Sequence, residues 1–179
     1  MSSERSRDAG DAAAHYLEQT VTEFRKLRTL AERALAQPAD ERLFLQALPG
    51  GVNSVAIIVK HLGGNLASRW TDFLTTDGEK PWRDRESEFG TRSVTRAELL
   101  AKWEEGWRVL FATLSTLDDD ALVRSIAIRG EPHTVLQALH RSLAHAAYHV
   151  GQIVLLSKSF RGDGWKSLTI PRGGIPGAR

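Results

Sequence analysis

Cysteine is absent from the 179-residue sequence. Its absence excludes a disulfide framework, a zinc–thiolate site, a CxxC redox pair and a cysteine nucleophile. A metal ion would therefore have to be held by histidine, aspartate, glutamate or water. Any thiol chemistry would need a thiol that comes from outside the protein.

A strong excess of charge of one sign is also missing. The sequence has 24 basic and 22 acidic side chains, and its formal net charge is +2. Proteins that bind a phosphate backbone usually carry a basic patch or stripe. Arg172 and Arg179 lie in a Gly/Pro-rich end and form no basic helix. We therefore expect no nucleic-acid partner.

Long hydrophobic runs are lacking as well. One of the longest purely aliphatic runs, residues 55–59, is far shorter than the roughly 20 residues that cross a membrane. Residues 1–11 are polar and of mixed charge, without the apolar centre of a signal peptide. The sequence therefore predicts a cytoplasmic protein without a membrane partner.

Four stretches of the sequence show helical periodicity. Apolar residues recur at steps of three and four over about 11–36, 53–75, 95–117 and 132–159. Four amphipathic helices of this length pack most naturally as a four-helix bundle. We therefore expect an all-α protein with one bundle domain over residues 11–160. Residues 1–10 should be a flexible N-terminus, and residues 161–179 a Gly/Pro-rich tail.

The ends and interiors of these helices carry further signals. Thr95 followed by Glu98 matches a capping box, and Pro132 suits the first turn of a helix. Gly63 and Gly64 interrupt the second helix, and each costs about 1 kcal/mol relative to alanine in an exposed helix interior. A close packing partner or a bound group over this stretch would explain the two glycines, and so would simple tolerance of their cost.

The connection between the second and third helices is long and polar. Residues 76–94 can extend to about 60 Å, enough to run the length of the bundle. The sequence therefore predicts a long crossover that allows helices two and three to be parallel neighbours. The charged stretch 77–86 within it could be a lid, a substrate-reading loop or a dimer contact.

The last helix carries a histidine pair. His145 and His149 are four residues apart, which places both imidazoles on one helix face. At 100° per residue this face includes Gln152 and lies roughly 130° from the centre of the apolar stripe. The pair therefore belongs either to the surface or to the wall of a groove. Two ring nitrogens at this spacing can converge on one cation at about 2.0–2.1 Å each.

His61 in the second helix is the best candidate for a third ligand. Three neutral imidazoles and a water would make an open site of the catalytic type. Imidazole suits zinc, nickel, copper or iron, so ligand type alone does not choose the metal. We expect a divalent metal, with zinc or nickel as the first candidates. His15, His133 and His140 are expected at the surface, and Glu131 at a helix N-terminus.

Two short motifs carry a family resemblance. The run His145-Ala-Ala-Tyr-His149-Val-Gly-Gln-Ile, paired with Val59-Lys-His61-Leu, resembles the DinB/YfiT-like superfamily of metal-binding four-helix bundles. Residues 65–89 look like one uncharacterised bacterial branch of that superfamily, and the resemblance covers roughly residues 12–160. It implies that His61, His145 and His149 form the metal triad, with open positions for water or substrate.

The resemblance also implies classes of activity. Some superfamily members are thiol-dependent S-transferases and isomerases that use thiols such as bacillithiol or mycothiol, and others look like metal-dependent hydrolases. We therefore expect an S-transferase-like or hydrolase-like enzyme that acts on a small electrophilic substrate, with a low-molecular-weight thiol as one candidate partner. The alternative is a non-catalytic metal- or ligand-binding stress-response protein, because no clear acid/base residue accompanies the triad.

Three further residues are candidates for the site. Asn65 and Arg69 follow His61 by four and eight residues on the same helix face. They could orient a substrate, and Arg69 could grip a carboxylate or phosphate; an ordinary contact between helices is the alternative. Gln152 could support a metal ligand by hydrogen bonding, or have an unrelated structural role. Tyr148 is expected to pack, with proton donation as the alternative.

Five tryptophans are more than a small core requires. Trp103 and Trp107 lie on the apolar stripe of the third helix and are expected in the core. Trp70 and Trp82 could instead anchor a subunit interface, where aromatic residues concentrate. On this basis we expect a homodimer.

Overall fold

The computed structural model is predominantly helical, and it describes residues 2–38, 44–46, 49–90 and 95–170. Its helices are α1 (Ser2–Leu35), α2 (Val55–Trp70), α3 (Arg85–Phe89), α4 (Arg96–Leu114) and α5 (Val135–Arg161). An antiparallel hairpin of β1 (Ser125–Ile128) and β2 (Glu131–Thr134) precedes α5. Two 3-10 turns, η2 (Asp119–Val123) and η3 (Gly162–Gly164), complete the described elements. The helical class predicted from the sequence is confirmed, and the hairpin is an addition to it.

The starts of the helices follow their capping residues. Ser54 accepts a hydrogen bond from Ile57 N and caps α2. The predicted capping box of Thr95 and Glu98 is confirmed at the start of α4. These side chains satisfy backbone N–H groups that the first helical turn leaves without a partner.

Three predicted helix ends were wrong. α1 begins at Ser2, well before residue 11. α2 ends at Trp70, before residue 75, because Thr71 adopts an extended conformation with φ −70° and ψ 131°. α5 begins at Val135, after a capping box headed by Thr134, because Pro132 pairs with Ala127 in the hairpin.

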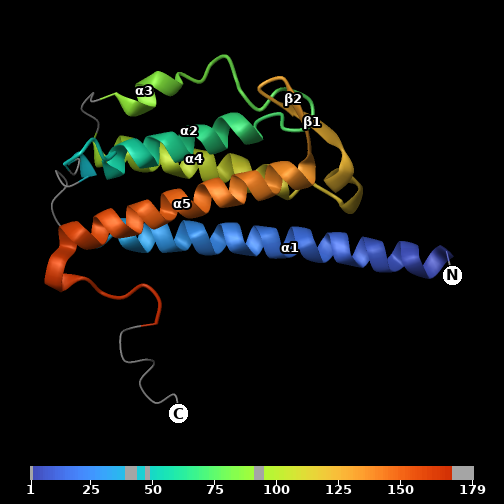
Figure 1. Cartoon of the computed structure of the whole chain (residues 1–179), viewed down its shortest axis with the longest axis horizontal. Coiled ribbons are helices and arrows are strands. Elements are labelled where there is room, and N and C mark those ends of the chain that lie inside the picture. Colours follow the sequence, from blue (N-terminus) through green and yellow to red (C-terminus); the bar gives the residue numbers. More distant parts are fainter. Residues whose placement is uncertain (1, 39–43, 47–48, 91–94, 171–179) are drawn as a thin grey trace, which may run out of the picture.

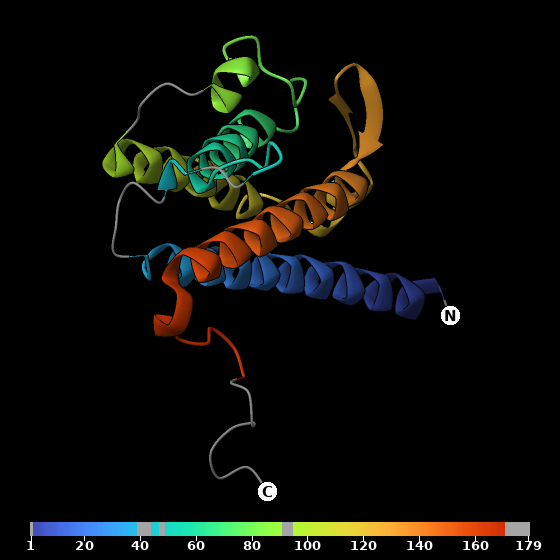
Figure 2. The same cartoon turned by 60° about the vertical axis from the view of Figure 1, so that its left-hand side comes forward.

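The four longer helices form two side-by-side pairs, α1 with α5 and α2 with α4 (Figures 1 and 2). α2 and α4 run in the same direction, since Gly63 meets Gly106 and Trp70 O accepts a 2.7 Å bond from Thr113 Oγ1 farther along both helices. The parallel arrangement allowed by the long crossover is therefore present. The connection between α2 and α4 carries α3, which lies on the outer side of α2 (Figure 1).

Glycines allow the close approach of α2 and α4. A Cβ atom on Gly106 would lie 2.5 Å from the carbonyl oxygen of Gly63, and a Cβ atom on Gly63 would lie 2.7 Å from that of Lys102. Backbone atoms cannot yield as a side chain can, so both positions need glycine. Close packing thus explains Gly63, one of the two interruptions noted in the second helix.

Aromatic side chains fill the core between the helices. Trp103 and Trp107 are fully buried, as predicted. Trp70 is also fully buried, and its indole donates a 3.2 Å hydrogen bond to Ser142 Oγ. Trp70 is thus a core residue, and its expected place in a subunit interface was wrong. Trp82 is 58% exposed.

The Asp77 carboxylate holds the crossover against the hairpin. Asp77 accepts hydrogen bonds from the backbone N–H groups of Glu79, Arg129 and Gly130. Arg129 and Gly130 have positive φ angles of 56° and 76°, as a two-residue turn of this kind requires. These three backbone bonds lower the pKa of Asp77.

None of the helices described is long and apolar enough to cross a lipid bilayer. Near the C-terminal part of the described chain, Lys166 is held by Gln37, which lies just after the end of α1. The Gln37 side chain exchanges two hydrogen bonds with the backbone of Lys166. The predicted Gly/Pro-rich tail continues into residues 171–179, which lie outside the described residues.

Candidate metal centre

Three histidines from two helices meet at one point of the structure. His61 comes from α2, and His145 and His149 come from successive turns of α5. One ring nitrogen from each lies within 4.8 Å of the others, and no other such group of potential ligands occurs in the part of the chain that the structure describes. The three histidines that the sequence suggested therefore do form a group that could hold a metal ion.

The separation of two ring nitrogens fits a shared cation. His61 Nε2 and His145 Nε2 lie 3.3 Å apart. Two nitrogens bound at about 2.0–2.1 Å to one tetrahedral ion are separated by about 3.3–3.4 Å, whereas a normal N–H···N hydrogen bond would be shorter. The spacing therefore suits a metal ligand pair better than a direct hydrogen bond.

Hydrogen bonds at Nδ1 of His61 and of His149 leave the Nε2 atom of each ring without a proton. His61 Nδ1 donates to Glu88 Oε2 at 2.9 Å, and His149 Nδ1 donates to Gln152 Oε1 at 2.8 Å. In both rings the remaining Nε2 then carries a lone pair. His149 Nε2 is buried and has no hydrogen-bond partner among the described residues. Such an unpartnered buried acceptor is what a bound cation would satisfy.

Burial keeps the α5 histidines neutral. Burial, together with the neighbouring His149 and His61, lowers the pKa of His145 to about 3. Burial also lowers the pKa of His149, although its bond to Gln152 acts in the opposite direction. Both imidazoles are therefore uncharged near pH 7, which is the form that binds metals.

Glu88 is a functional candidate that the sequence analysis missed. It lies in α3, is buried, and accepts from His61 and from Arg83, whose Nε and Nη2 contact its two oxygens at 2.8 Å each. Burial alone would raise the pKa of Glu88, but the bonds from His61 and Arg83 outweigh it and lower the pKa. A carboxylate behind a metal-binding histidine fixes its ring and its tautomer.

Gly64 makes room for this carboxylate. A Cβ atom on Gly64 would lie 2.2 Å from Glu88 Oε1. The second interruption in the helix therefore has its own explanation, a group placed over that stretch. A glycine three residues after His61 was the signal in the sequence. It did not identify which acidic residue of the crossover lies over this position.

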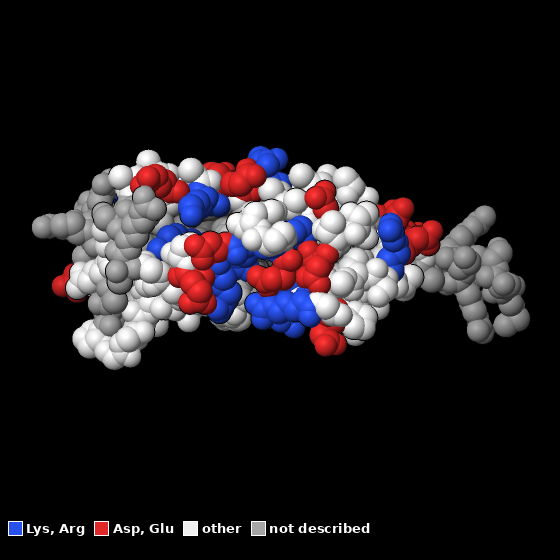
Figure 3. All heavy atoms as spheres, turned by 90° about the horizontal axis from the view of Figure 1, so that it is seen from above, with Lys and Arg blue, Asp and Glu red and all other residues white. Residues whose placement is uncertain are grey.

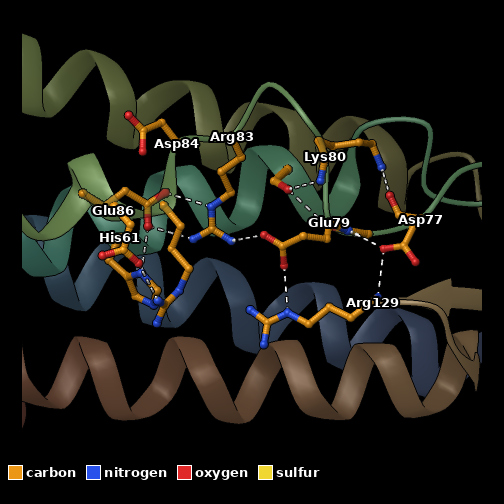
Figure 4. A network of polar contacts seen from close by, with 12 residues as sticks. His61, Asp77, Glu79, Lys80, Arg83, Asp84, Glu86 and Arg129 are labelled. Atoms are coloured by element: carbon orange, nitrogen blue, oxygen red, sulfur yellow. Dashed lines mark hydrogen bonds and ion pairs between the residues drawn. The ribbon is translucent and has the colours of Figure 1, made fainter.

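The polar network extends from the histidines along the crossover (Figure 4). Arg83 links Glu88 to Glu79, with 3.8 Å between Arg83 Nη1 and Glu79 Oε1. Glu79 in turn accepts from Arg129 Nε at 2.9 Å. A chain of hydrogen bonds and ion pairs thus connects His61 on α2 to the hairpin turn before α5. It holds the crossover in one position above the histidines.

A cavity of about 220 Å³ adjoins two of the three histidines. Its lining includes His61 and His145, and also Asn65 and Arg69, as the shared helix face predicted. Asn65 is half-buried and Arg69 is buried. Both predicted helpers therefore border the same space as the candidate ligands.

The remaining candidates lie around the edge of the site. Gln152 is exposed and reaches the centre only through His149. Tyr148 is 54% exposed and lines the cavity, with its ring against both α5 histidines. His15 and His140 are exposed, and His133 lies in the hairpin with Nδ1 bonded to the carbonyl oxygen of Glu131. None of these three histidines joins the cluster.

Comparison with known proteins gives one match. Residues 11–174 match the sequence profile of a family described as "Protein of unknown function (DUF1572)". No curated protein and no solved structure matches the chain. The match spans all three histidines and the crossover that carries Glu88.

Proposed function

The chain belongs to the DUF1572 family, and we propose that it is a divalent-metal-dependent enzyme that activates a water or a small-molecule thiol against a small electrophilic substrate. The observation that carries the proposal is the convergence of His61, His145 and His149 beside a cavity. No fourth histidine or carboxylate joins them within the described residues. Three ligands with a free side are typical of catalytic sites rather than structural ones.

The proposal includes a finer assignment of the fold. We assign the chain to the DinB/YfiT-like four-helix bundles, with α1, α2, α4 and α5 as the four helices. Support comes from the parallel α2 and α4 and from the long crossover between them. Support also comes from the position of the histidines, two on the last helix and one on the second.

Each residue around the centre has a role in this proposal. When bound, a zinc or nickel ion supplies a Lewis acid that lowers the pKa of a water or thiol and so produces a nucleophile near neutral pH. Glu88 and Gln152 hold the rings of His61 and His149 through their Nδ1 atoms. Asn65 and Arg69 line the cavity, where they bind and orient the substrate.

A second candidate function is metal or ligand binding without catalysis. One observation favours it: no aspartate or glutamate is among the described residues that line the cavity. Glu88 is close, but both of its oxygens are occupied by His61 and Arg83. The site therefore offers no free carboxylate as a general base, and a catalysed reaction would depend on the metal for its nucleophile.

Metal analysis followed by an activity panel tests the proposal. Protein purified without an affinity tag should contain about one zinc or nickel ion per chain. His149→Ala should bind the ion at least a hundredfold more weakly, since one of three ligands is lost. His140→Ala is the matched control, because His140 is an exposed histidine of the same helix.

The activity panel combines thiols, electrophiles and hydrolysable esters. Turnover that disappears on chelation and returns with zinc or nickel would support the enzyme. A bound ion without turnover of any panel compound would favour the binding protein instead. Equal metal contents in His149→Ala and His140→Ala would contradict the site itself.

A further inference from the structure

Arginine is the commonest residue around the cavity. Five arginines contribute to its lining, Arg69, Arg83, Arg85, Arg129 and Arg141, and no acidic residue does so among the described residues. This composition contrasts with the outer face of the crossover, where basic and acidic side chains lie next to one another (Figure 3). Among the described residues, the cavity lining therefore carries positive side chains without negative ones beside them.

Three of the five arginines already have acidic partners. Arg83 pairs with Glu88 at 2.8 Å, and Arg129 pairs with Glu79 at 2.9 Å. Arg85 is 3.6 Å from Glu86. Arg83 and Arg129 are thus paired at hydrogen-bonding distance, whereas the contact of Arg85 is longer and exposed to solvent.

Arg69 has no such partner. Its side chain is buried with only 6% of the residue exposed, and its Nη1 has no hydrogen-bond partner within the part of the chain described. Burial lowers the pKa of Arg69 and the positive charge of Arg141 adds to this effect, while the negative charge of Glu79 acts in the opposite direction. A buried guanidinium nitrogen without a hydrogen-bond partner is costly, and the usual solution is an oxyanion that accepts two N–H groups of the guanidinium.

Arg141 lies across the cavity from α2, on α5. It is exposed and makes no ion pair with any described acidic residue. The two unpaired arginines thus belong to the two helices that also carry the histidines. An anion between them would lie beside the nitrogens of the metal centre.

We propose that the cavity binds a small molecule through an oxyanion, a carboxylate or a phosphate, which Arg69 and Arg141 hold beside the three histidines. The inference rests on the proposed function, because it names the substrate class of that same site. At about 220 Å³ the cavity is smaller than typical ligand sites of roughly 300–1,000 Å³. The occupant is therefore a small acid or phosphate ester, or the anionic end of a larger molecule.

Calorimetric titration tests the anion site directly. Zinc-loaded and metal-free proteins are each titrated with inorganic phosphate and with succinate at constant ionic strength, which separates the two oxyanion classes. Arg69→Gln and Arg141→Gln should each bind the preferred anion at least tenfold more weakly than the wild type. Arg108→Gln is the control, because Arg108 is exposed on α4 and pairs with Glu105 away from the cavity.

The outcomes distinguish this inference from the proposed function. Zinc binding without affinity for either anion would overturn the anion site alone. If the wild-type protein binds neither zinc nor nickel but still binds an anion through both arginines, the anion site is supported and the metal-dependent function is overturned. Unchanged affinity in Arg141→Gln would also overturn the inference, since replacing this exposed side chain leaves the fold intact.

Discussion

The two faces of α2 are built in opposite ways. Towards α4 the helix presents Gly63, where the absence of a side chain brings two backbones into contact. Towards α5 it presents His61, Asn65 and Arg69, whose polar groups border a cavity. One face gains stability by close packing, and the other gives up packing to keep polar atoms available. Substitutions on the two faces should therefore change different properties.

Substitutions at the contact between α2 and α4 around Gly63 should have the largest effect on stability. Gly106→Ala should lower the free energy of unfolding by about 3 kcal/mol, because its Cβ atom would meet backbone atoms of Gly63 at 2.5 and 2.9 Å. Gly151→Ala is the matched control, since a Cβ atom on this helical glycine would have nothing within 4 Å. The control should raise stability by about 0.5–1 kcal/mol. Urea unfolding of both variants measures the difference, and similar values would contradict the close contact.

Substitutions around His61, on the face of α2 that borders the cavity, should change the affinity for metal. Glu88→Gln should weaken metal binding by about 10- to 100-fold, the usual effect of losing a carboxylate behind a ligand histidine. Gly64→Ala provides a second variant, because its Cβ atom would displace the Glu88 carboxylate without removing its charge. Competition with a chromogenic chelator gives the affinities. Wild-type affinity in both variants would show that Glu88 does not position His61.

The smallest effect should come from the edge of the centre. Gln152→Ala should weaken metal binding by less than tenfold, because water can replace an exposed hydrogen-bond acceptor behind His149. The same chelator competition measures it. A loss greater than that of Glu88→Gln would reverse the ranking of the two supporting residues.

The sequence predicted the helices and the pairing of His145 with His149 on one face because both depend on regular spacing. The four-residue step from His145 to His149 and the recurrence of apolar residues are local patterns, and the helix preserves them. A close packing partner was one of the explanations that the sequence left open for Gly63, although the sequence did not name that partner. A Cβ atom on Gly63 would meet the backbone of Lys102, on a helix whose direction depends on the crossover.

The sequence did not predict Glu88, because its position depends on contacts between distant segments. The crossover also contains Glu79, Asp84 and Glu86, and no periodicity separates these acids from one another. Glu88 is selected by the bidentate contact with Arg83 and by the space above Gly64. The sequence placed Pro132 in the last helix and so missed β2, because proline fits both the first turn of a helix and a short strand at a sheet edge.

His61 and His145 are separated by 84 positions along the chain. An ion shared between them would cross-link α2 to α5 and close a loop that includes the crossover, α4 and the hairpin. Closing so long a loop restricts the unfolded chain, and only the folded chain offers all three nitrogens together. The thermal stability of the protein would then rise with the concentration of free metal, because an ion that binds only the folded chain favours the folded state.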